Sequence, residues 1–457
     1  MNRRVMERAE AETVASWLLD RSLKSPEVSG ADVVYFSSES HSLSLLDGEP
    51  EENVSGVSGG ISLRVIGKDG RQGVAYGNNF SKRSLENMIG WSLENLRSSE
   101  PEKDITLFSG PTNADDSALE LFDDSVAGSI TQEKRMKACL EMTDAARSRD
   151  SRVASVRSAS WGDGFAESLY ASSAGVSGWK RSTSVSCGAA VVMQDGDSLE
   201  MGAYGNGESH LADIKYHEYA TLAVDKTASL LGGKPLRTGK YTLLLPPEIS
   251  AALADEIGDL FCSSVVHKGH SLMKGKLGVQ IAGSAVTLTD DARLPRRAGS
   301  AVFDGEGVPT GKTILIDSGV ASNYLYNLQY AAKDGVASTG SASRGLGGLP
   351  DVGTSNLVLS PGPYSVDFLR KGVDSGFLVL ELMGLHTLNP VSGDFSLGAK
   401  GVRLRGGLPG EPVAGVTISG NLIDILKKVT AVGSDLKFFG SVGAPSIVVE
   451  DVVVAGN

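Results

Sequence analysis

Glycine is the residue that most constrains how this chain can fold. The 457 residues include 56 glycines, which is about 12% against roughly 7% in an average protein. Glycine weakens helix interiors and permits the backbone angles that tight turns require. Aromatic residues contribute only 6% of the sequence. This combination favours many strands joined by turns and argues against a helix bundle.

Charge and cysteine content limit which binding partners and which cellular compartment we expect. The formal net charge is −12, and an acidic surface repels nucleic-acid backbones and anionic lipid surfaces. We therefore expect no nucleic-acid partner and no membrane partner. Three widely spaced cysteines, Cys139, Cys187 and Cys262, form no disulfide framework. No apolar run approaches the ~18 residues of a membrane span, and the first residues lack the pattern of a signal peptide. A soluble, cytoplasmic protein is expected.

Two small α+β domains are expected in the first half of the chain, over residues 1–110 and 115–233, with a charged linker near 100–115. Each is expected to run helix, strands, helix, with the strands in an antiparallel meander. The predicted helices are 5–23, Ser81–Ser98 (N-cap Ser81 or Ser84), Thr131–Arg149 and His210–Leu231. The predicted strands are Asp32–Ser38, Ser42–Leu46, Ile61–Ile66, Gly73–Tyr76, Arg152–Trp161, Glu167–Ser172, Ser182–Gln194 and Ser198–Tyr204.

Residues 236–457 are expected to form a larger, mostly β domain, so the fold class is α+β. One long helix is predicted over Glu248–Val266, continuing toward His270. Further along, the pattern predicts short strands with only two helices, Val366–Lys371 and Leu422–Val429. The β-branched run Pro445–Val454 predicts a buried strand.

His267 and His270 are the closest pair of histidines in the chain. At i and i+3 on one helix they would share a face and could bind a metal together. A hydrolytic zinc site also needs a third ligand and a general base. The neighbour Lys268 would repel a cation, so structural or surface histidines are the simpler interpretation. The residues alone assign no catalytic, cofactor-binding or metal-binding role.

Three shorter matches to known motifs fail on their context. His217-Glu218 begins like a zinc-binding HExxH motif, but the second histidine position is Thr221. Gly56–Gly60 matches GxSxG by letters, yet a strand pattern follows where a nucleophile elbow needs a helix. Gly311–Thr313 resembles the end of a P-loop and is likewise followed by a strand pattern.

Long segments of the C-terminal part resemble a known family. ELMGLHTLNPVSGDFSLGAKG (381–401), Gly415–Leu436 and Phe303–Arg344 are similar to segments of the TldD/PmbA family, once labelled "modulator of DNA gyrase" and now regarded as peptidases. The resemblance extends over nearly the whole chain. It implies a peptidase that acts on unstructured peptides, bound in an extended form through their backbones.

The same resemblance implies that this chain belongs to the branch without metal. In TldD-type members a helix carries His-Glu-x-x-x-His, and a cysteine near the C-terminus completes a zinc site. Matching Gly269-His270 to the family's second histidine places Val265 and Val266 at the first histidine and the glutamate. Taking His267 as the first histidine instead places Lys268 at the glutamate and Leu272 at the second histidine. The last cysteine is Cys262, so the C-terminal ligand is also lacking.

The expectation is therefore a PmbA/TldE-like subunit of a cytoplasmic metallopeptidase complex, with no cofactor of its own. A TldD-type partner subunit would contribute the zinc, and a homodimer is an alternative assembly. A second hypothesis is an autonomous peptidase with an atypical site at His267 and His270 and a carboxylate from elsewhere, such as Asp259, Glu381 or Asp394. A third is a non-enzymatic binding or regulatory protein.

Overall fold

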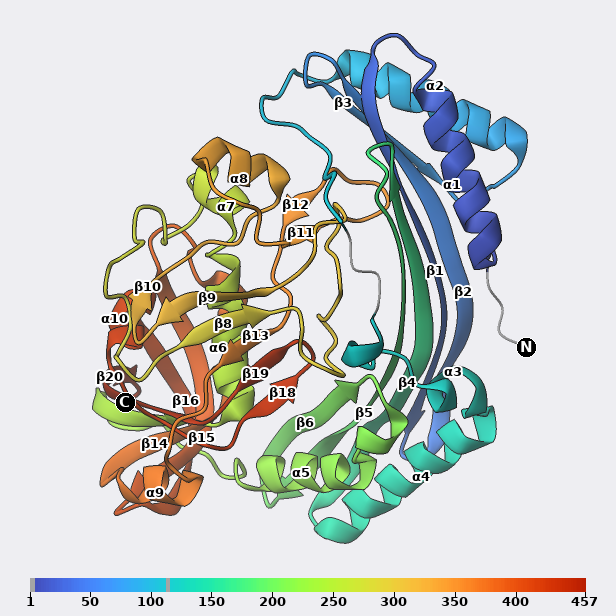
Figure 1. The fold of residues 1–457 in the computed structure, drawn as a ribbon. Helices are drawn as coiled ribbons and strands as arrows, with labels where there is room; N and C mark the ends of the chain where they lie inside the picture. The colour runs from blue at the N-terminus through green and yellow to red at the C-terminus, as the bar shows by residue number, and fades with distance from the viewer. Residues whose placement is uncertain (1–4, 112–115) are drawn as a thin grey trace.

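The strands of the first half form one long, curved sheet, and the helices of the first half cover its outer face (Figure 1). The structure, a computed structural model, describes residues 5–111 and 116–457. Within that part, six strands pair in the order β3-β2-β1-β4-β5-β6. The elements are α1 (Arg8–Ser22), β1 (Val28–Leu46), β2 (Glu49–Gly67), β3 (Gln72–Gly77), α2 (Lys82–Ser98), α3 (Asp124–Ser129), α4 (Gln132–Arg149), β4 (Val153–Ser172), β5 (Ser177–Asp195), β6 (Ser198–Glu208) and α5 (Tyr216–Ala228).

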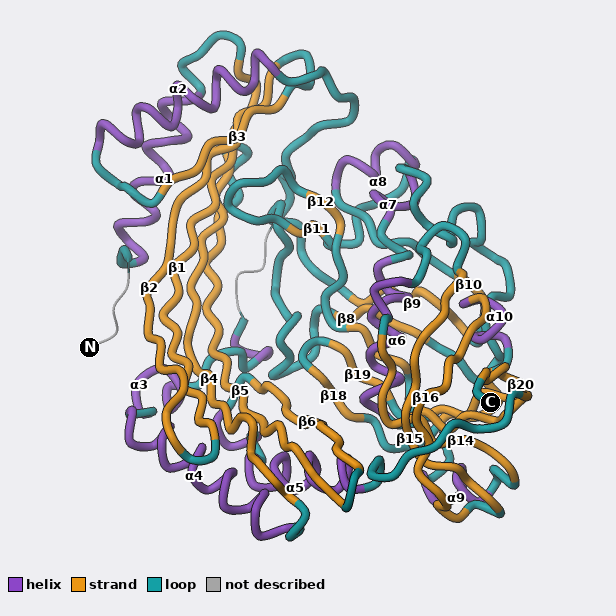
Figure 2. Tube along the Cα trace, turned by 180° about the vertical axis from the view of Figure 1, so that it is seen from behind, coloured by secondary structure: helices purple, strands orange, loops and turns teal. Residues whose placement is uncertain are grey.

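The remaining residues form a β-rich domain that faces the concave side of this sheet (Figures 1 and 2). In its described residues, two six-stranded sheets run β10-β9-β8-β13-β19-β18 and β16-β15-β14-β7-β20-β17, and β11 and β12 form a small two-stranded sheet. Its strands are β7 (Gly239–Leu245), β8 (Leu288–Asp291), β9 (Lys312–Asp317), β10 (Val320–Ala321), β11 (Ala342–Ser343), β12 (Asp351–Val352), β13 (Leu357–Leu359), β14 (Ser375–Met383), β15 (Asp394–Arg405), β16 (Leu408–Asn421), β17 (Val429–Val432), β18 (Lys437–Phe439), β19 (Val442–Ala444) and β20 (Ile447–Ala455). Its helices are α6 (Pro247–Asp259), α7 (Ser263–His267), α8 (Leu328–Asp334), α9 (Val366–Lys371) and α10 (Leu422–Lys427).

The predicted fold class is confirmed: α+β in the first half, with a large, mostly β C-terminal domain. The first-half strands nevertheless join into one sheet across the predicted linker, because β1 pairs with β4 along most of its length. The end of that linker, residues 112–115, lies outside the described residues. The predicted boundaries between domains stay predictions.

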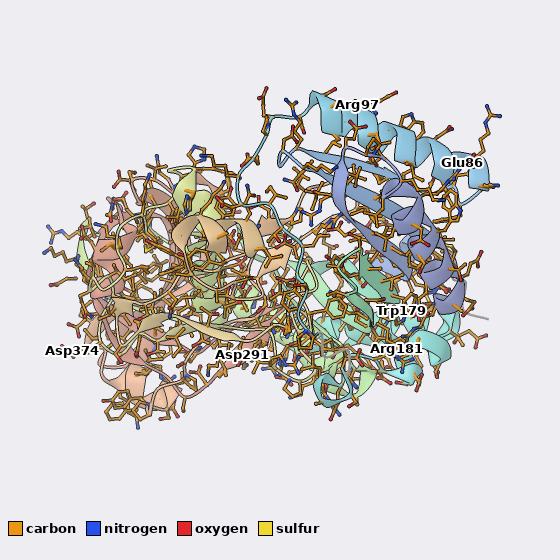
Figure 3. The ribbon with its side chains drawn as sticks, turned by 45° about the horizontal axis from the view of Figure 1, so that its top comes forward. Glu86, Arg97, Trp179, Arg181, Asp291 and Asp374 are labelled. Carbon is orange, nitrogen blue, oxygen red and sulfur yellow. The ribbon has the colours of Figure 1, made fainter. Side chains whose placement is uncertain are left out.

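The two faces of the long sheet differ in chemistry because successive residues of a strand point to opposite sides. Tyr35 and Leu43 of β1 lie on the side of the helices, where they pack under α1 and α4 respectively. Trp179 of β5 stacks on Tyr35 with 6.1 Å between ring centroids, and Figure 3 shows it beside α1. Val34 of β1 points to the other side, where it packs against the cluster that contains Phe303 of the C-terminal domain.

The strands are much longer than predicted. The two runs expected within 32–46 form one strand, β1, and the run expected at 61–66 is only the end of β2. Serine and glycine fill the missing stretches, Gly56–Gly60 among them, so they carry no alternating apolar signal. Pairing with neighbouring strands holds these segments extended despite their weak propensity.

The predicted long helix ending near His270 is wrong. Helix α6 ends at Asp259, and the separate short helix α7 begins at Ser263. Between them the backbone bonds to the segment around Leu325: Ser263 N–H donates to the Leu325 carbonyl, and Leu325 N–H donates to the Phe261 carbonyl. A tertiary contact therefore interrupts a local pattern that favours helix. The helix predicted over His210–Leu231 is also shorter in the structure, where α5 covers only Tyr216–Ala228.

Among the helices in residues 5–111 and 116–457, none combines the length and the apolar character needed to cross a membrane.

Candidate functional site

The structure does not place the two candidate histidines on one helix face. His267 is the last residue of α7, and its Nε2 lies 2.8 Å from Asp334 Oδ1 of α8. Gly269 then adopts a φ of +74°, which turns the chain, and His270 N–H donates back to the Val265 carbonyl. The ring of His267 packs on Tyr330, with 5.2 Å between centroids. The i, i+3 argument for a shared metal therefore fails.

The other predicted ligand candidates lie in separate surroundings. Asp259 lies at the end of α6, where burial and the charge of Asp255 raise its pKa. Glu381 on β14 lies near lysines of α5 and β15, and burial raises its pKa. Asp394 accepts a hydrogen bond from Asn421. Across residues 5–111 and 116–457, no three His, Cys, Asp or Glu side chains form a group that could hold a metal ion.

The three rejected motifs fall where their context predicted. Gly56–Gly60 lies within strand β2, and Lys312 of the P-loop-like segment begins strand β9. His217 is an exposed residue near the start of α5, 3.6 Å from Glu141 of α4. Each occupies an ordinary structural position in the sheet or helix that contains it.

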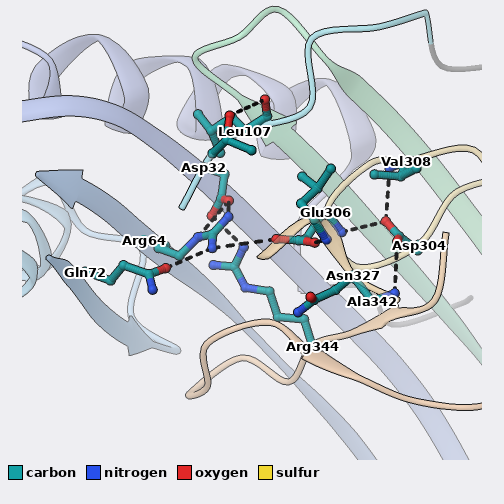
Figure 4. A network of polar contacts seen from close by, with 12 residues as sticks. Asp32, Arg64, Gln72, Leu107, Asp304, Glu306, Val308, Asn327, Ala342 and Arg344 are labelled. Atoms are coloured by element: carbon teal, nitrogen blue, oxygen red, sulfur yellow. Dashed lines mark hydrogen bonds and ion pairs between the residues drawn. The ribbon is translucent and has the colours of Figure 1, made fainter. Parts of the chain in front are cut away.

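A buried ionic network joins the long sheet to the C-terminal domain, and sequence reasoning missed it (Figure 4). Asp32 of β1 is fully buried and accepts hydrogen bonds from Arg64 of β2 and from Arg344, which follows β11. Arg64 is 2% exposed and also donates to Gln72. Burial alone would raise the pKa of Asp32, but the charges of Arg344 and Arg64 outweigh it and hold that pKa below its usual value.

Two further carboxyl groups complete this network. Glu306 Oε1 lies 3.9 Å from Arg64 Nη1, and Glu306 Oε2 accepts from the Leu328 backbone N–H. Burial raises the pKa of Glu306 to about 7. Asp304 accepts three backbone N–H groups, those of Glu306, Val308 and Ala342, and so holds its own loop in place.

Glu306 should make the stability of the fold depend on pH. Its pKa rises from 4.5 to about 7 on folding, so the contribution of Glu306 is fully present below pH 4.5 and is lost as the pH rises through 7. Relative to a Glu306→Gln variant, the wild-type free energy of unfolding should fall by about 2–3 kcal/mol over that range. Chemical denaturation of both proteins at a series of pH values measures this difference. Two parallel pH profiles would contradict it.

Three cavities lie on the inward face of the long sheet. A cavity of about 230 Å³ adjoins the network on the side of Arg64, Glu306 and Asn327. A second, of about 350 Å³, is lined by Tyr170 and Arg344 together with other residues of β1, β4, β5 and the C-terminal domain. Further along the sheet lies an open groove of about 410 Å³. Its walls are mostly small residues: Ser42, Ser158, Ser160, Gly162, Ser186, Gly188, Ala190, Ala203 and Gly205.

This arrangement suits a ligand that presents backbone more than side chain. Small residues let an extended chain approach a sheet closely, and the charged network next to the cavities can hold a polar end group. A signal for the network exists in the sequence: Asp32 and Arg64 are single charges inside apolar strand runs. A charge in such a run is normally paired when it is buried.

Solved structures share the whole architecture. A protein described as a modulator of DNA gyrase from Bacteroides thetaiotaomicron has a TM-score of 0.88 and 27% identity, covering 99% of this chain and 100% of that chain. TldE from Thermococcus kodakarensis has a TM-score of 0.87 at 20% identity, covering 98% and 100%, a likeness of fold alone. The chain thus belongs to the class of proteins that share this complete fold.

Family models assign the chain more closely. The PmbA/TldA metallopeptidase domain 1 matches residues 31–96, the central domain matches 127–231 and the C-terminal domain matches 238–456. The chain belongs to the PmbA/TldD metallopeptidase family. Its relatives include the metalloprotease PmbA of Escherichia coli O157:H7, 24% identical over 95% of this chain and 94% of that protein. A metalloprotease of Methanothermobacter thermautotrophicus is 27% identical over 89% of this chain and 88% of that protein.

Proposed function

We propose that this chain is the PmbA/TldE-type subunit of a cytoplasmic metallopeptidase complex that degrades or processes unstructured peptides, and that a TldD-type partner contributes the metal. One observation carries the proposal. Val266 stands where the family resemblance places the general base, and its side chain is buried in the apolar core of the C-terminal domain. A packed valine can neither bind a metal nor accept a proton from water.

The residues around this position do not fit zinc. A catalytic zinc needs three protein ligands from histidine, cysteine or carboxylate. The matched positions hold Val265, Val266 and His270, and the nearby His267 is paired with Asp334. Cys262 is buried, and burial raises the pKa of its thiol well above the usual range. We therefore derive no step of peptide hydrolysis through a metal bound to this chain.

Peptide binding is the part of the reaction that this chain's own residues can supply. The groove of small residues and the cavities beside the ionic network lie along one sheet face, as an extended substrate requires. The small residues Ser160, Gly162 and Gly188 would let the substrate backbone approach the sheet closely and would select weakly among its side chains. This sheet face would bind the peptide in a heterodimer with a TldD-type subunit or, in the alternative assembly, in a homodimer.

Zinc content and peptide cleavage of one sample test the proposal. The purified chain alone should contain close to no zinc and should not cleave an unstructured peptide. Mixed with a TldD-type subunit, the same preparation should support cleavage that a chelator abolishes. A His270→Ala variant should behave like the wild type in the mixture, because this residue would hold no metal.

The opposite result would identify an autonomous peptidase. About one zinc per chain, with chelator-sensitive cleavage by the chain alone, would contradict the proposed subunit role. Loss of that zinc in both His267→Ala and His270→Ala variants would then locate the metal at α7. Cleavage that survives a chelator would exclude zinc chemistry in the complex.

A further inference from the structure

Arg344 has hydrogen-bonding capacity that the described part of the protein does not use. Its Nη1 donates to Asp32, but its Nε and Nη2 meet no acceptor in residues 5–111 and 116–457. The side chain is only 1% exposed. A buried guanidinium with two unused donors is costly unless a ligand or water satisfies them.

The unused atoms form the edge of a guanidinium that binds carboxylates elsewhere in this chain. Arg135 places Nε and Nη2 at 2.6 and 2.7 Å from the two oxygens of Asp163. Arg149 does the same with Asp225 at 2.7 and 2.8 Å. Such paired bonds match the spacing of two carboxylate oxygens. The chemistry that fits the free edge of Arg344 is therefore a carboxylate.

Other donors line the same 350 Å³ cavity. The hydroxyl of Tyr170 is buried without a hydrogen-bond partner in the described residues. Lys180 Nζ makes one long bond, 3.4 Å, to the Phe303 carbonyl and lies 4.7 Å from the centre of that ring. Asp304 is the carboxylate in the lining, and three backbone N–H groups already engage its oxygens. The unused hydrogen-bonding groups of the cavity are therefore donors, and the ligand that fits them is a hydrogen-bond acceptor.

The charges around the cavity also favour an added anion. Two buried guanidiniums, those of Arg64 and Arg344, share the single carboxylate of Asp32. Glu306 is 3.9 Å from Arg64, on the side of the neighbouring cavity. Lys180 lines the same cavity; burial lowers the pKa of its ammonium group, and the nearby charge of Asp304 opposes that shift. Because Glu306 lies beside Arg64, a ligand carboxylate at Arg344 would give that second guanidinium a carboxylate partner besides the shared Asp32.

We propose that this cavity binds the C-terminal carboxylate of an extended peptide, held by Arg344, Lys180 and Tyr170. This inference rests on the proposed peptide substrate and adds how one end of it is recognised. The cavity also has an apolar wall, which suits an apolar last side chain. That wall consists of Val34, Phe36, Phe303 and Leu346.

The position of the cavity fits a peptide that continues along the sheet. On β4, Ser168 lines this cavity and Gly162 lines the open groove. At about 3.3 Å per residue the two are roughly 20 Å apart, the length of about six extended residues. Nε and Nη2 of Arg344 have almost no accessible surface, so entry of the carboxylate requires the adjoining Gly345-Leu346 segment to move aside.

Fluorescence anisotropy with the full chain and two labelled peptides tests this. Both are unstructured and end in leucine, one as the free acid and one as the C-terminal amide. The wild type should bind the acid about tenfold more tightly than the amide. Tyr170→Phe and Lys180→Gln should each shrink that ratio to about threefold or less, with the affinity for the amide unchanged. Lys137→Gln, at an exposed position on α4, is the matched control and should keep the wild-type ratio.

Other outcomes overturn the inference. Equal affinity for acid and amide would remove the carboxylate site and leave peptide binding intact. Displacement of the acid peptide by millimolar inorganic phosphate would assign the cavity to phosphate instead. Binding of neither peptide would also overturn the inference, whereas the proposed function is decided separately by cleavage in the mixed complex. Tyr170→Phe removes only an unpartnered hydroxyl, so a folding defect should not obscure the result.

Discussion

Replacing Asp32 with asparagine should lower the free energy of unfolding by about 3–5 kcal/mol, because removing one member of a buried ionic group leaves its partners uncompensated. The substitution keeps the size of the side chain and removes its charge. The nearly inaccessible guanidinium of Arg344 would then lose its carboxylate partner, and that of Arg64 would keep only the more distant Glu306, at 3.9 Å. Chemical denaturation measures the change, followed by fluorescence and circular dichroism.

The matched control is the exposed pair of Arg149 and Asp225, in which both side chains are about half exposed. Asp225→Asn removes the same chemical group from a similar paired geometry, yet should cost less than about 1 kcal/mol, as exposed ion pairs do. If the two substitutions cost the same, the network around Asp32 would not stabilise the contact between the long sheet and the C-terminal domain.

Replacing Phe377 with alanine should cost about 3–5 kcal/mol, the range for a buried phenylalanine that leaves a cavity. Phe377 lies on β14, has no exposed surface and belongs to the main core of the C-terminal domain. Gly401 on the paired strand β15 approaches its ring closely, so neighbouring backbone has little freedom to fill the space. Thermal unfolding measures the loss.

Phe368→Ala is the control for that substitution. Phe368 lies on α9 of the same domain, is 59% exposed and stacks on the exposed Tyr364. Its removal should change stability by about 0.5 kcal/mol or less. A large effect at Phe368, or a small one at Phe377, would mean that the core of the domain is assigned wrongly.

Features decided by neighbouring residues could be predicted from the sequence. Ser81, one of the two predicted caps, caps α2 through its side chain, and Thr131, where the next predicted helix begins, caps α4. Helix α9 coincides with the predicted Val366–Lys371. The β-branched run near the C-terminus forms β20, with most of its apolar residues buried.

Features decided by contacts between distant residues could not be predicted from the sequence. The break between α6 and α7 depends on hydrogen bonds to Leu325, more than sixty residues away. The ion pair of Asp32 and Arg344 joins residues 312 positions apart. The long serine- and glycine-rich strands are extended because their neighbours pair with them, and such pairings leave no periodic trace in either segment alone. The candidate site is built mainly from these distant contacts.

The position of β20 in its sheet has a consequence for how the protein is made. This strand pairs with β7 and with β17 and β16, although roughly 200 residues separate it from β7 along the chain. During translation β7 therefore leaves the ribosome long before its neighbour exists, with hydrogen-bonding groups and leucines unprotected. This late pairing of β7 with β20 slows folding and leaves an unpaired strand edge that can associate with other nascent chains. We expect the C-terminal domain to mature after release and to depend on chaperones more than the first half does.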